Sequence, residues 1–183
     1  MQTFAVYVDN KPGVLNRVAS LFRRRAFNIE SLTVGHTETP GLSRMTIVVD
    51  TDERGARLVE ANLYKLIPVR RVDNITRVPT IGRDLAMIKV AATGDARTQV
   101  MQLVDVYRSR IVDVSPESLV IETTGTEDKI DSLLEVLRPY GVMEMVRTGR
   151  VEMARGNTPP SPKLTSRASG AEKKTKSDVN MSV

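Results

Sequence analysis

The sequence contains no cysteine and no tryptophan, and its 183 residues include only three phenylalanines and four tyrosines. Without cysteine, the chain can form neither a disulfide framework nor a thiolate metal site. No apolar run approaches the roughly 20 residues that a membrane-spanning helix needs. The start, MQTFAVYV, lacks the basic segment and long apolar stretch of a secretory signal. We therefore expect a cytoplasmic protein without membrane contact.

The charge of the chain is uneven along its length. The net charge is +5, but residues 156–183 alone carry +3, which leaves only +2 for residues 1–155. The same terminal segment is rich in proline, serine, threonine and lysine and has no aromatic residue, a composition typical of disorder. We expect residues 156–183 to be a disordered basic tail. The basic character is therefore mostly a property of the tail, and it does not indicate a nucleic-acid surface on the folded part.

Four segments have apolar residues at the spacing of an amphipathic helix. Their apolar positions are Val14, Val18, Leu21 and Phe22; Ala56, Val59, Leu63 and Leu66; Val100, Leu103, Val104 and Tyr107; and Ile130, Leu133, Leu134 and Leu137. Short runs rich in β-branched residues separate these segments and predict strands. The runs cover residues 4–8, 29–34, 45–50, 69–75, 85–91, 111–114, 119–123 and 142–146.

The order strand, helix, strand, strand, helix, strand occurs twice, over residues 2–76 and 84–152. This βαββαβ order is typical of a ferredoxin-like unit, in which a four-stranded antiparallel sheet carries both helices on one face. We predict an α+β protein with two tandem ferredoxin-like domains, residues 1–77 and 83–155, joined by a linker at 78–82. The uncovered face of each sheet must pair with a partner sheet, a second copy or a ligand.

The loop between the first strand and the first helix is a candidate anion site. Gly13 permits a close approach or an unusual backbone angle. The N–H groups of the first helical turn, including those of Val14 and Leu15, have no partner within the helix and suit a carboxylate. Asn10 adds a donor and an acceptor, which suits an amino acid. The same residues also fit a tight turn that binds nothing.

A second stretch, residues 27–34, follows the cationic helix end Arg23–Arg25. Asn28 fits a turn residue that ends the helix. The three arginines fit a favourable interaction with the helix dipole, although they could also contact an acidic partner.

Three segments, DNKPGVLNRV at 9–18, FNIESLTV at 27–34 and LSRMTI at 42–47, resemble the amino-terminal ACT domain of the acetolactate (acetohydroxyacid) synthase small subunit. The segments MIKV at 87–90 and IVDV at 111–114 resemble the carboxy-terminal domain of that family. The resemblance covers about residues 2–155.

This resemblance implies a non-catalytic regulatory subunit. Such a subunit binds and stimulates the catalytic large subunit, and it confers feedback inhibition by valine in branched-chain amino acid biosynthesis. The resemblance also implies a homodimer through the ACT domains, with valine at the interface. The effector site would take Asn10, Gly13, Val14 and Leu15 from one chain and Asn28 and Ile29 from its neighbour. Thiamine diphosphate, Mg²⁺ and FAD would belong to the large subunit, and this chain would hold no cofactor.

The second repeat lacks the candidate loop. Its first strand is followed by Ala91-Ala92-Thr93-Gly94-Asp95, with no asparagine and with an acid where a carboxylate would have to bind. We predict that this half binds no amino acid in the same way. Dimerisation and contact with the catalytic subunit both remain open as its role.

Three other functions fit the sequence less well. An enzyme in its own right would need an acid–base pair, a metal-ligand cluster or a nucleophile motif, and we find none around the lone His36. An RNA-binding module of the same topology would stack bases on aromatic residues, yet Met45, Ile47 and Val49 occupy the expected third strand. An ACT-containing regulator of another enzyme or of transcription remains, although no helix-turn-helix segment supports a DNA role.

Overall fold

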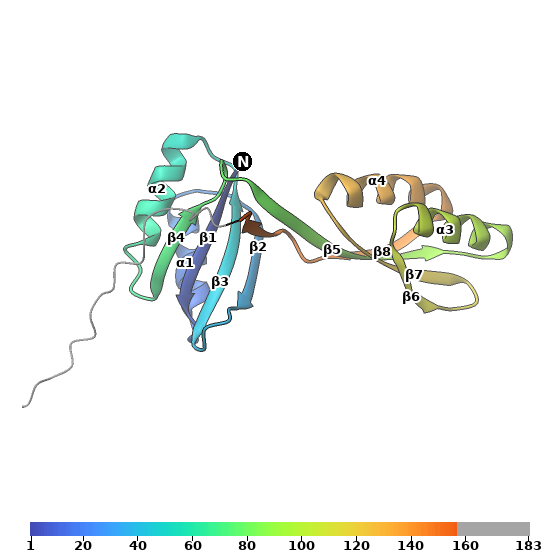
Figure 1. The fold of residues 1–183 in the computed structure, drawn as a ribbon, viewed down its shortest axis with the longest axis horizontal. Coiled ribbons are helices and arrows are strands. Elements are labelled where there is room, and N and C mark those ends of the chain that lie inside the picture. Colours follow the sequence, from blue (N-terminus) through green and yellow to red (C-terminus); the bar gives the residue numbers. More distant parts are fainter. Residues whose placement is uncertain (157–183) are drawn as a thin grey trace, which may run out of the picture.

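The computed structural model describes residues 1–156, which form two α+β units joined by a two-stranded ribbon (Figure 1). The first unit contains β1 (Gln2–Asp9), α1 (Val14–Arg24), β2 (Ile29–His36), β3 (Leu42–Val49), α2 (Glu53–Leu63) and β4 (Val69–Asn74). The second unit contains β5 (Thr80–Ala91), α3 (Gly94–Val106), β6 (Arg110–Val114), β7 (Ser118–Gly125), α4 (Glu127–Leu137), the 3₁₀ helix η1 (Arg138–Tyr140), β8 (Val142–Arg147) and β9 (Val151–Ala154). The predicted pair of tandem ferredoxin-like units is confirmed, while the expected tail lies outside the described residues except for Gly156.

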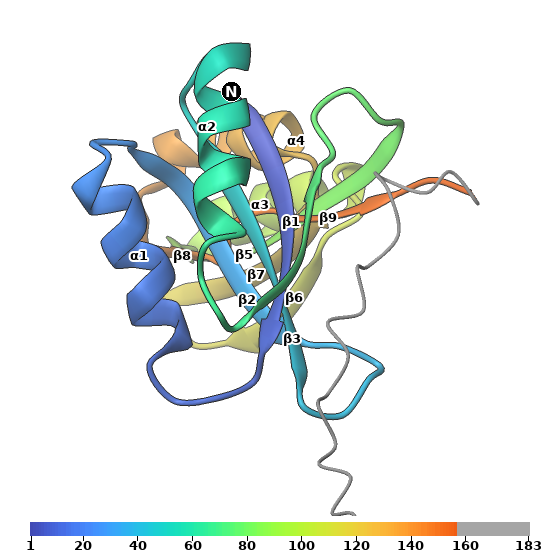
Figure 2. The same cartoon turned by 90° about the vertical axis from the view of Figure 1, so that its left-hand side faces the viewer.

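The first unit is a four-stranded sheet in the order β2-β3-β1-β4, with α1 and α2 on one face (Figure 2). Alternate residues of β1 and β3 point toward the helices, as a strand period of two requires. They form one buried core with residues of α1, α2 and β4. Its members are Phe4, Val6, Val8, Val14, Val18, Leu21, Phe22, Met45, Ile47, Val49, Ala56, Val59, Leu63, Val69 and Val72. Leu66, expected inside the second helix, packs on this core from the turn after α2.

The second unit repeats the arrangement, with the strand order β6-β7-β5-β8. Its buried core comes from one face of β5 and β7 and from α3 and α4. The core residues are Ile88, Val90, Ala92, Val100, Val104, Leu119, Ile121, Leu133 and Leu137. Three of the predicted helix positions, Leu103, Tyr107 and Leu134, pack at the margin of this core and are only partly buried.

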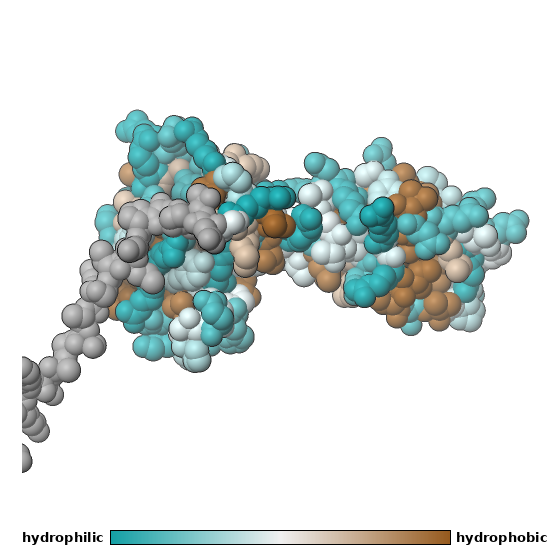
Figure 3. Space-filling model, viewed as in Figure 1, coloured by the Kyte–Doolittle hydropathy of each residue, from teal (hydrophilic) through white to brown (hydrophobic). Residues whose placement is uncertain are grey.

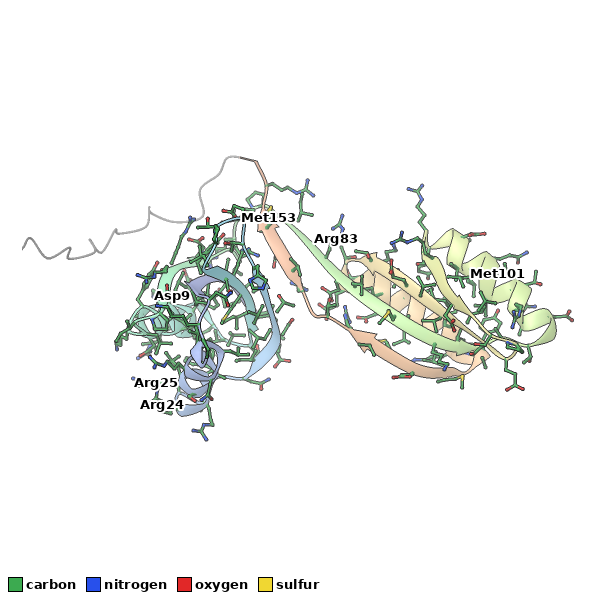
Figure 4. The ribbon with its side chains drawn as sticks, turned by 90° about the horizontal axis from the view of Figure 1, so that it is seen from below. Asp9, Arg24, Arg25, Arg83, Met101 and Met153 are labelled. Carbon is green, nitrogen blue, oxygen red and sulfur yellow. The ribbon has the colours of Figure 1, made fainter. Side chains whose placement is uncertain are left out.

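The ribbon between the units is the feature that the sequence did not predict. β5 begins at Thr80, inside the expected linker, and its residues Thr80–Arg83 pair antiparallel with Val151–Ala154 of β9. Arg83 and Met153, labelled in Figure 4, lie on the two strands of this ribbon. The remainder of β5 pairs with β7 and β8 inside the second sheet. One twelve-residue strand therefore belongs to both the connection and the second unit.

None of the helices described within residues 1–156 is long and apolar enough to span a membrane.

Candidate functional site

The loop between β1 and α1 has the backbone geometry that its glycine requires. Gly13 is the N-cap residue of α1 and has φ +79°, a left-handed conformation that other residues rarely adopt. No atom lies within 4 Å of the position that a Cβ would take there. The N–H of Asn10 donates to the carbonyl of Gly41 at 2.8 Å, which fixes the start of the loop. Glycine is therefore needed for its φ angle, and the space in front of it is open.

Only some of the N–H groups in the first turn of α1 are free to bind a ligand. The N–H of Val14 donates to the carbonyl of Lys11 at 3.4 Å, a long and weak bond that closes the tight turn. Lys11 precedes α1, so this N–H has no partner within the helix, as expected, but the loop before the helix already binds it. Among residues 1–156, the N–H of Leu15 has no acceptor, as expected. Val14 is buried in the core, whereas the Leu15 side chain is 46% exposed beside the loop. The helix end thus offers the N–H groups of Leu15 and Asn16, neither of which has an acceptor among the described residues, and an accessible aliphatic side chain.

A histidine that the sequence did not assign to the site stands next to it. His36 is the last residue of β2, and its Nδ1 lies 3.4 Å from the Nδ2 of Asn10. The two residues meet because β1 and β2 both pair antiparallel with β3, so they run parallel and end at the same edge. Both side chains are exposed. A ligand at the loop could therefore contact a third polar group.

The charge of Asp9 at the end of β1 is neutralised locally. Arg70 binds its carboxylate through two nitrogens, with Nε 2.5 Å from Oδ1 and Nη2 2.9 Å from Oδ2. Lys11 lies 3.5 Å from Oδ2. The hydrogen bond from Arg70 holds the pKa of Asp9 below its ordinary value, so this acid is ionised and paired at neutral pH. It therefore opposes an anionic ligand at Gly13 much less than a free carboxylate would.

Asn28 and Ile29 lie at the other end of the same unit. Ile29 pairs with Val49 at the end of β3, whereas His36, seven residues along, pairs with Ser43 near the start of β3. At about 3.3 Å per residue, β2 separates these two ends by roughly 23 Å. The exposed Asn28 side chain donates to the Glu30 carboxylate. A single chain therefore does not bring Asn28 and Ile29 to the loop at Gly13.

Two copies of the chain could bring the two ends together. β2 is an edge strand that pairs only with β3 among the described elements. If the β2 edges of two chains paired antiparallel about a twofold axis, the start of one β2 would lie beside the end of the other. Asn28 of one chain would then approach the loop at Gly13 of its neighbour.

The open face of the first sheet carries a charged groove of about 620 Å³. The Tyr7 ring lies 5.8 Å from the guanidinium of Arg44 and 5.4 Å from that of Arg71, within cation–π range. Asp73 is fully buried and accepts a 2.8 Å hydrogen bond from Arg71. Burial raises the pKa of Asp73, and the bond from Arg71 opposes that rise. The ribbon strand β9 reaches this face, with Val151 and Met153 in the wall of the groove.

Two of the three arginines at the end of α1 bind groups within the first unit. The Nε of Arg24 donates to the carbonyl of Ser20 at 3.3 Å, and Arg25 donates to the Oδ1 of Asn62 at 3.4 Å. The first of these bonds satisfies a carbonyl near the helix C-terminus, where positive charge is favoured.

The second unit has no equivalent of the loop. α3 begins at Gly94 with Asp95 in its first turn, and neither asparagine nor an extended loop precedes it. On the face shown in Figure 3, the second unit instead carries several apolar patches, coloured brown. Among the exposed apolar side chains are Met101, Val106, Val112, Val114, Met143 and Val146. Within residues 1–156, no group of three or more histidine or acidic side chains could hold a metal ion.

Known families match both halves of the chain. Residues 4–71 match the family described as "AHAS small subunit-like ACT domain", and residues 83–156 match "Small subunit of acetolactate synthase". A "Probable acetolactate synthase small subunit" of Archaeoglobus fulgidus is 52% identical over 155 residues, which cover 85% of this chain and 97% of the relative. The acetolactate synthase small subunit of Mycolicibacterium smegmatis is 47% identical, with 84% and 91% covered.

A solved structure supports the same relationship. The crystal structure of the acetolactate synthase small subunit from Thermotoga maritima superposes with a TM-score of 0.81 at 42% identity. The matched region covers 86% of this chain and 98% of that one. The similarity therefore extends over both units and the connection between them.

Proposed function

Because the chain belongs to the acetolactate synthase small-subunit family, we propose that it binds the catalytic large subunit, raises its activity and confers feedback inhibition by valine. It is a regulatory subunit with an ACT-like domain. The chemistry of acetolactate formation, with thiamine diphosphate, Mg²⁺ and FAD, is assigned to the large subunit. The two family matches also support a division into domains at 1–77 and 83–155.

The observation that carries the proposal is the open loop at Gly13. The left-handed glycine leaves free space in front of the first turn of α1, and the Leu15 N–H points out of the helix end without an acceptor among the described residues. A helix N-terminus of this kind favours a carboxylate. Asn10 lies beside this loop, and its amide could hydrogen-bond to the ammonium or the carboxylate of an amino acid. Pairing of Asp9 with Arg70 removes the nearest competing negative charge.

The rest of the effector site comes from a second chain in this proposal. Asn28 would add another polar contact, and Ile29 would contact the aliphatic side chain of valine. Their distance from Gly13 within one chain and the open edge of β2 support a site shared across a twofold axis. The apolar exterior of the second unit suits either dimer contacts or the catalytic subunit.

The shared site explains how valine could act at a distance. A ligand that bridges two chains stabilises the dimer arrangement in which both halves of the site meet. If that arrangement stimulates the catalytic subunit less well, valine shifts the population toward lower activity. The inhibition then requires no contact between valine and the reacting atoms.

The proposal is tested by reconstituting the chain with a catalytic large subunit and measuring acetolactate formation with and without valine. We expect stimulation by this chain and inhibition by valine.

Asn10→Ala should weaken valine binding, measured by calorimetry, by roughly 1–3 kcal/mol if its hydrogen bond is made. Gln102→Ala, which removes an exposed amide from α3, is the matched control and should bind valine like the wild type. Absence of both stimulation and valine binding would contradict the proposal.

A further inference from the structure

The segment between β8 and β9 contacts the first unit through its main chain. The carbonyl of Arg150 accepts a 2.9 Å hydrogen bond from the hydroxyl of Thr33, and the N–H of Arg150 donates to the hydroxyl of Ser31 at 3.2 Å. Ser31 and Thr33 are two residues apart in β2 and therefore project from the same face. The backbone of a single residue is thus held by two adjacent side chains of β2.

The side chain of the same residue contacts the second unit. The Nη2 of Arg150 lies 2.7 Å from the Oε2 of Glu127, the first residue of α4. An acid at this position also interacts favourably with the helix dipole. Arg150 therefore joins β2 to α4, with its main chain on one unit and its guanidinium on the other.

The approach of this segment to β2 is close enough to require a glycine. Gly149 has φ +83°, and a Cβ there would lie 2.7 Å from the Ser31 hydroxyl oxygen. Just beyond, the guanidinium of Arg44 on β3 donates to the carbonyl of Glu152. The segment therefore contacts the first sheet directly. A side chain at position 149 would collide with Ser31 and increase the distance between the segment and β2.

A cavity of about 320 Å³ lies beside this contact. Ser31 of the first unit and Asp84, Glu127 and Arg147 of the second line it, together with Arg150. The two units are thus separated by open space at this point of the junction. Beside this cavity, Arg150 connects the two units through its hydrogen bonds to β2 and its ion pair with Glu127.

We propose that the Gly149–Arg150 segment couples β2 to α4, and thereby transmits occupancy of the effector site to the second unit. β2 starts at Ile29, next to Asn28, and these two residues are the neighbour's contribution to the proposed site. The part of the inference that concerns valine rests on the proposed function. The mechanical connection rests on the hydrogen bonds alone. A displacement at the start of β2 moves Ser31 and Thr33, and Arg150 carries that displacement to the first turn of α4.

Hydrogen exchange of the full chain without valine tests the connection itself. Because coupling is reciprocal, a change on either side must reach the other. Glu127→Gln, which removes the ion pair in the second unit, should raise amide exchange in β2 by roughly threefold or more. The double variant Ser31→Ala, Thr33→Val should do the same at the start of α4. Arg83→Ala is the control, because Arg83 lies on the same ribbon and has no hydrogen bond or ion pair to β2 among the described residues. Equal exchange in Glu127→Gln and the control would overturn the proposal.

The reconstituted holoenzyme tests the regulatory consequence. The double variant should still bind valine in calorimetry, yet its maximal inhibition at saturating valine should be largely lost. Thr33→Ser keeps the hydroxyl that donates to the Arg150 carbonyl, so this variant should keep its inhibition by valine. Full inhibition in the double variant would overturn the proposal. Failure of the wild-type chain to bind valine would instead contradict the proposed function, and the exchange experiment would still decide whether β2 and α4 are coupled.

Discussion

Replacement of Gly13 by aspartate should weaken valine binding through charge rather than through misfolding. The Cβ of residue 13 would meet nothing within 4 Å, so the side chain fits, and the cost to folding is the left-handed φ of +79°. That conformation costs an L-residue about 1–2 kcal/mol, and less for Asp or Asn. The variant should therefore unfold at a somewhat lower temperature but remain folded.

The electrostatic effect on binding is larger. A carboxylate at position 13 would lie about 4–5 Å from a ligand carboxylate at the helix end, and two such charges repel by about 1–4 kcal/mol at effective dielectric constants of 20–80. Valine affinity should fall by about 5-fold to several hundred-fold. The loss should shrink as salt is added, because the loop is exposed and its charges are screened.

Two variants isolate this effect in calorimetric titrations. Gly13→Asn has nearly the same size and the same backbone cost without the charge, so it should bind valine more tightly than Gly13→Asp. Gly94→Asp places the same change at the start of α3, where φ is +53° and the space is also open. It should leave valine binding unchanged. Equal losses in the aspartate and asparagine variants would refute the electrostatic reasoning, and wild-type affinity in both would refute the site.

Three further changes test the electrostatics and packing of the chain. Arg70→Gln should cost under about 1 kcal/mol at pH 7, because Arg70 is half exposed. The lowered pKa of Asp9 contributes stability above its unfolded pKa, and this is lost as pH falls through the folded value; urea unfolding should therefore show the difference at pH 7 and not near pH 2. Asp52→Ala removes the N-cap acceptor of α2 and should cost about 1 kcal/mol, more than Thr126→Ala at the start of α4, where no side-chain capping bond exists. Ile88→Ala, fully buried in the second core, should cost about 2–5 kcal/mol in chemical unfolding, and a loss below 1 kcal/mol would contradict the assigned core.

Local patterns were sufficient to predict the two units. The spacing of Val14, Val18, Leu21 and Phe22 predicted the buried face of α1, and each of these side chains is buried. Such predictions succeed because helix and strand periods are properties of neighbouring residues. The left-handed conformation at Gly13 was predictable for the same reason. A short turn before a helix restricts the φ and ψ angles of its residues, and glycine is the residue that adopts a positive φ most easily.

The connection between the units was not predictable in this way. β9 has only four residues, and its pairing with Thr80–Arg83 joins segments about 70 positions apart. The bonds of Arg150 to Ser31 and Thr33 depend on the placement of one unit against the other. No local pattern carries that information. No local pattern places His36 beside Asn10 either, because only the parallel course of β1 and β2 brings the two residues together.

A complementation experiment tests the shared effector site most directly. Gly13→Asp damages the loop half of the site, and Asn28→Ala damages the strand half, so neither variant alone should bind valine normally. A mixed dimer of the two would combine an intact loop from one chain with an intact strand from the other. Random mixing should therefore restore tight calorimetric binding at about one quarter of the wild-type stoichiometry per chain. No recovery on mixing, although heterodimers form, would contradict a site shared between two chains.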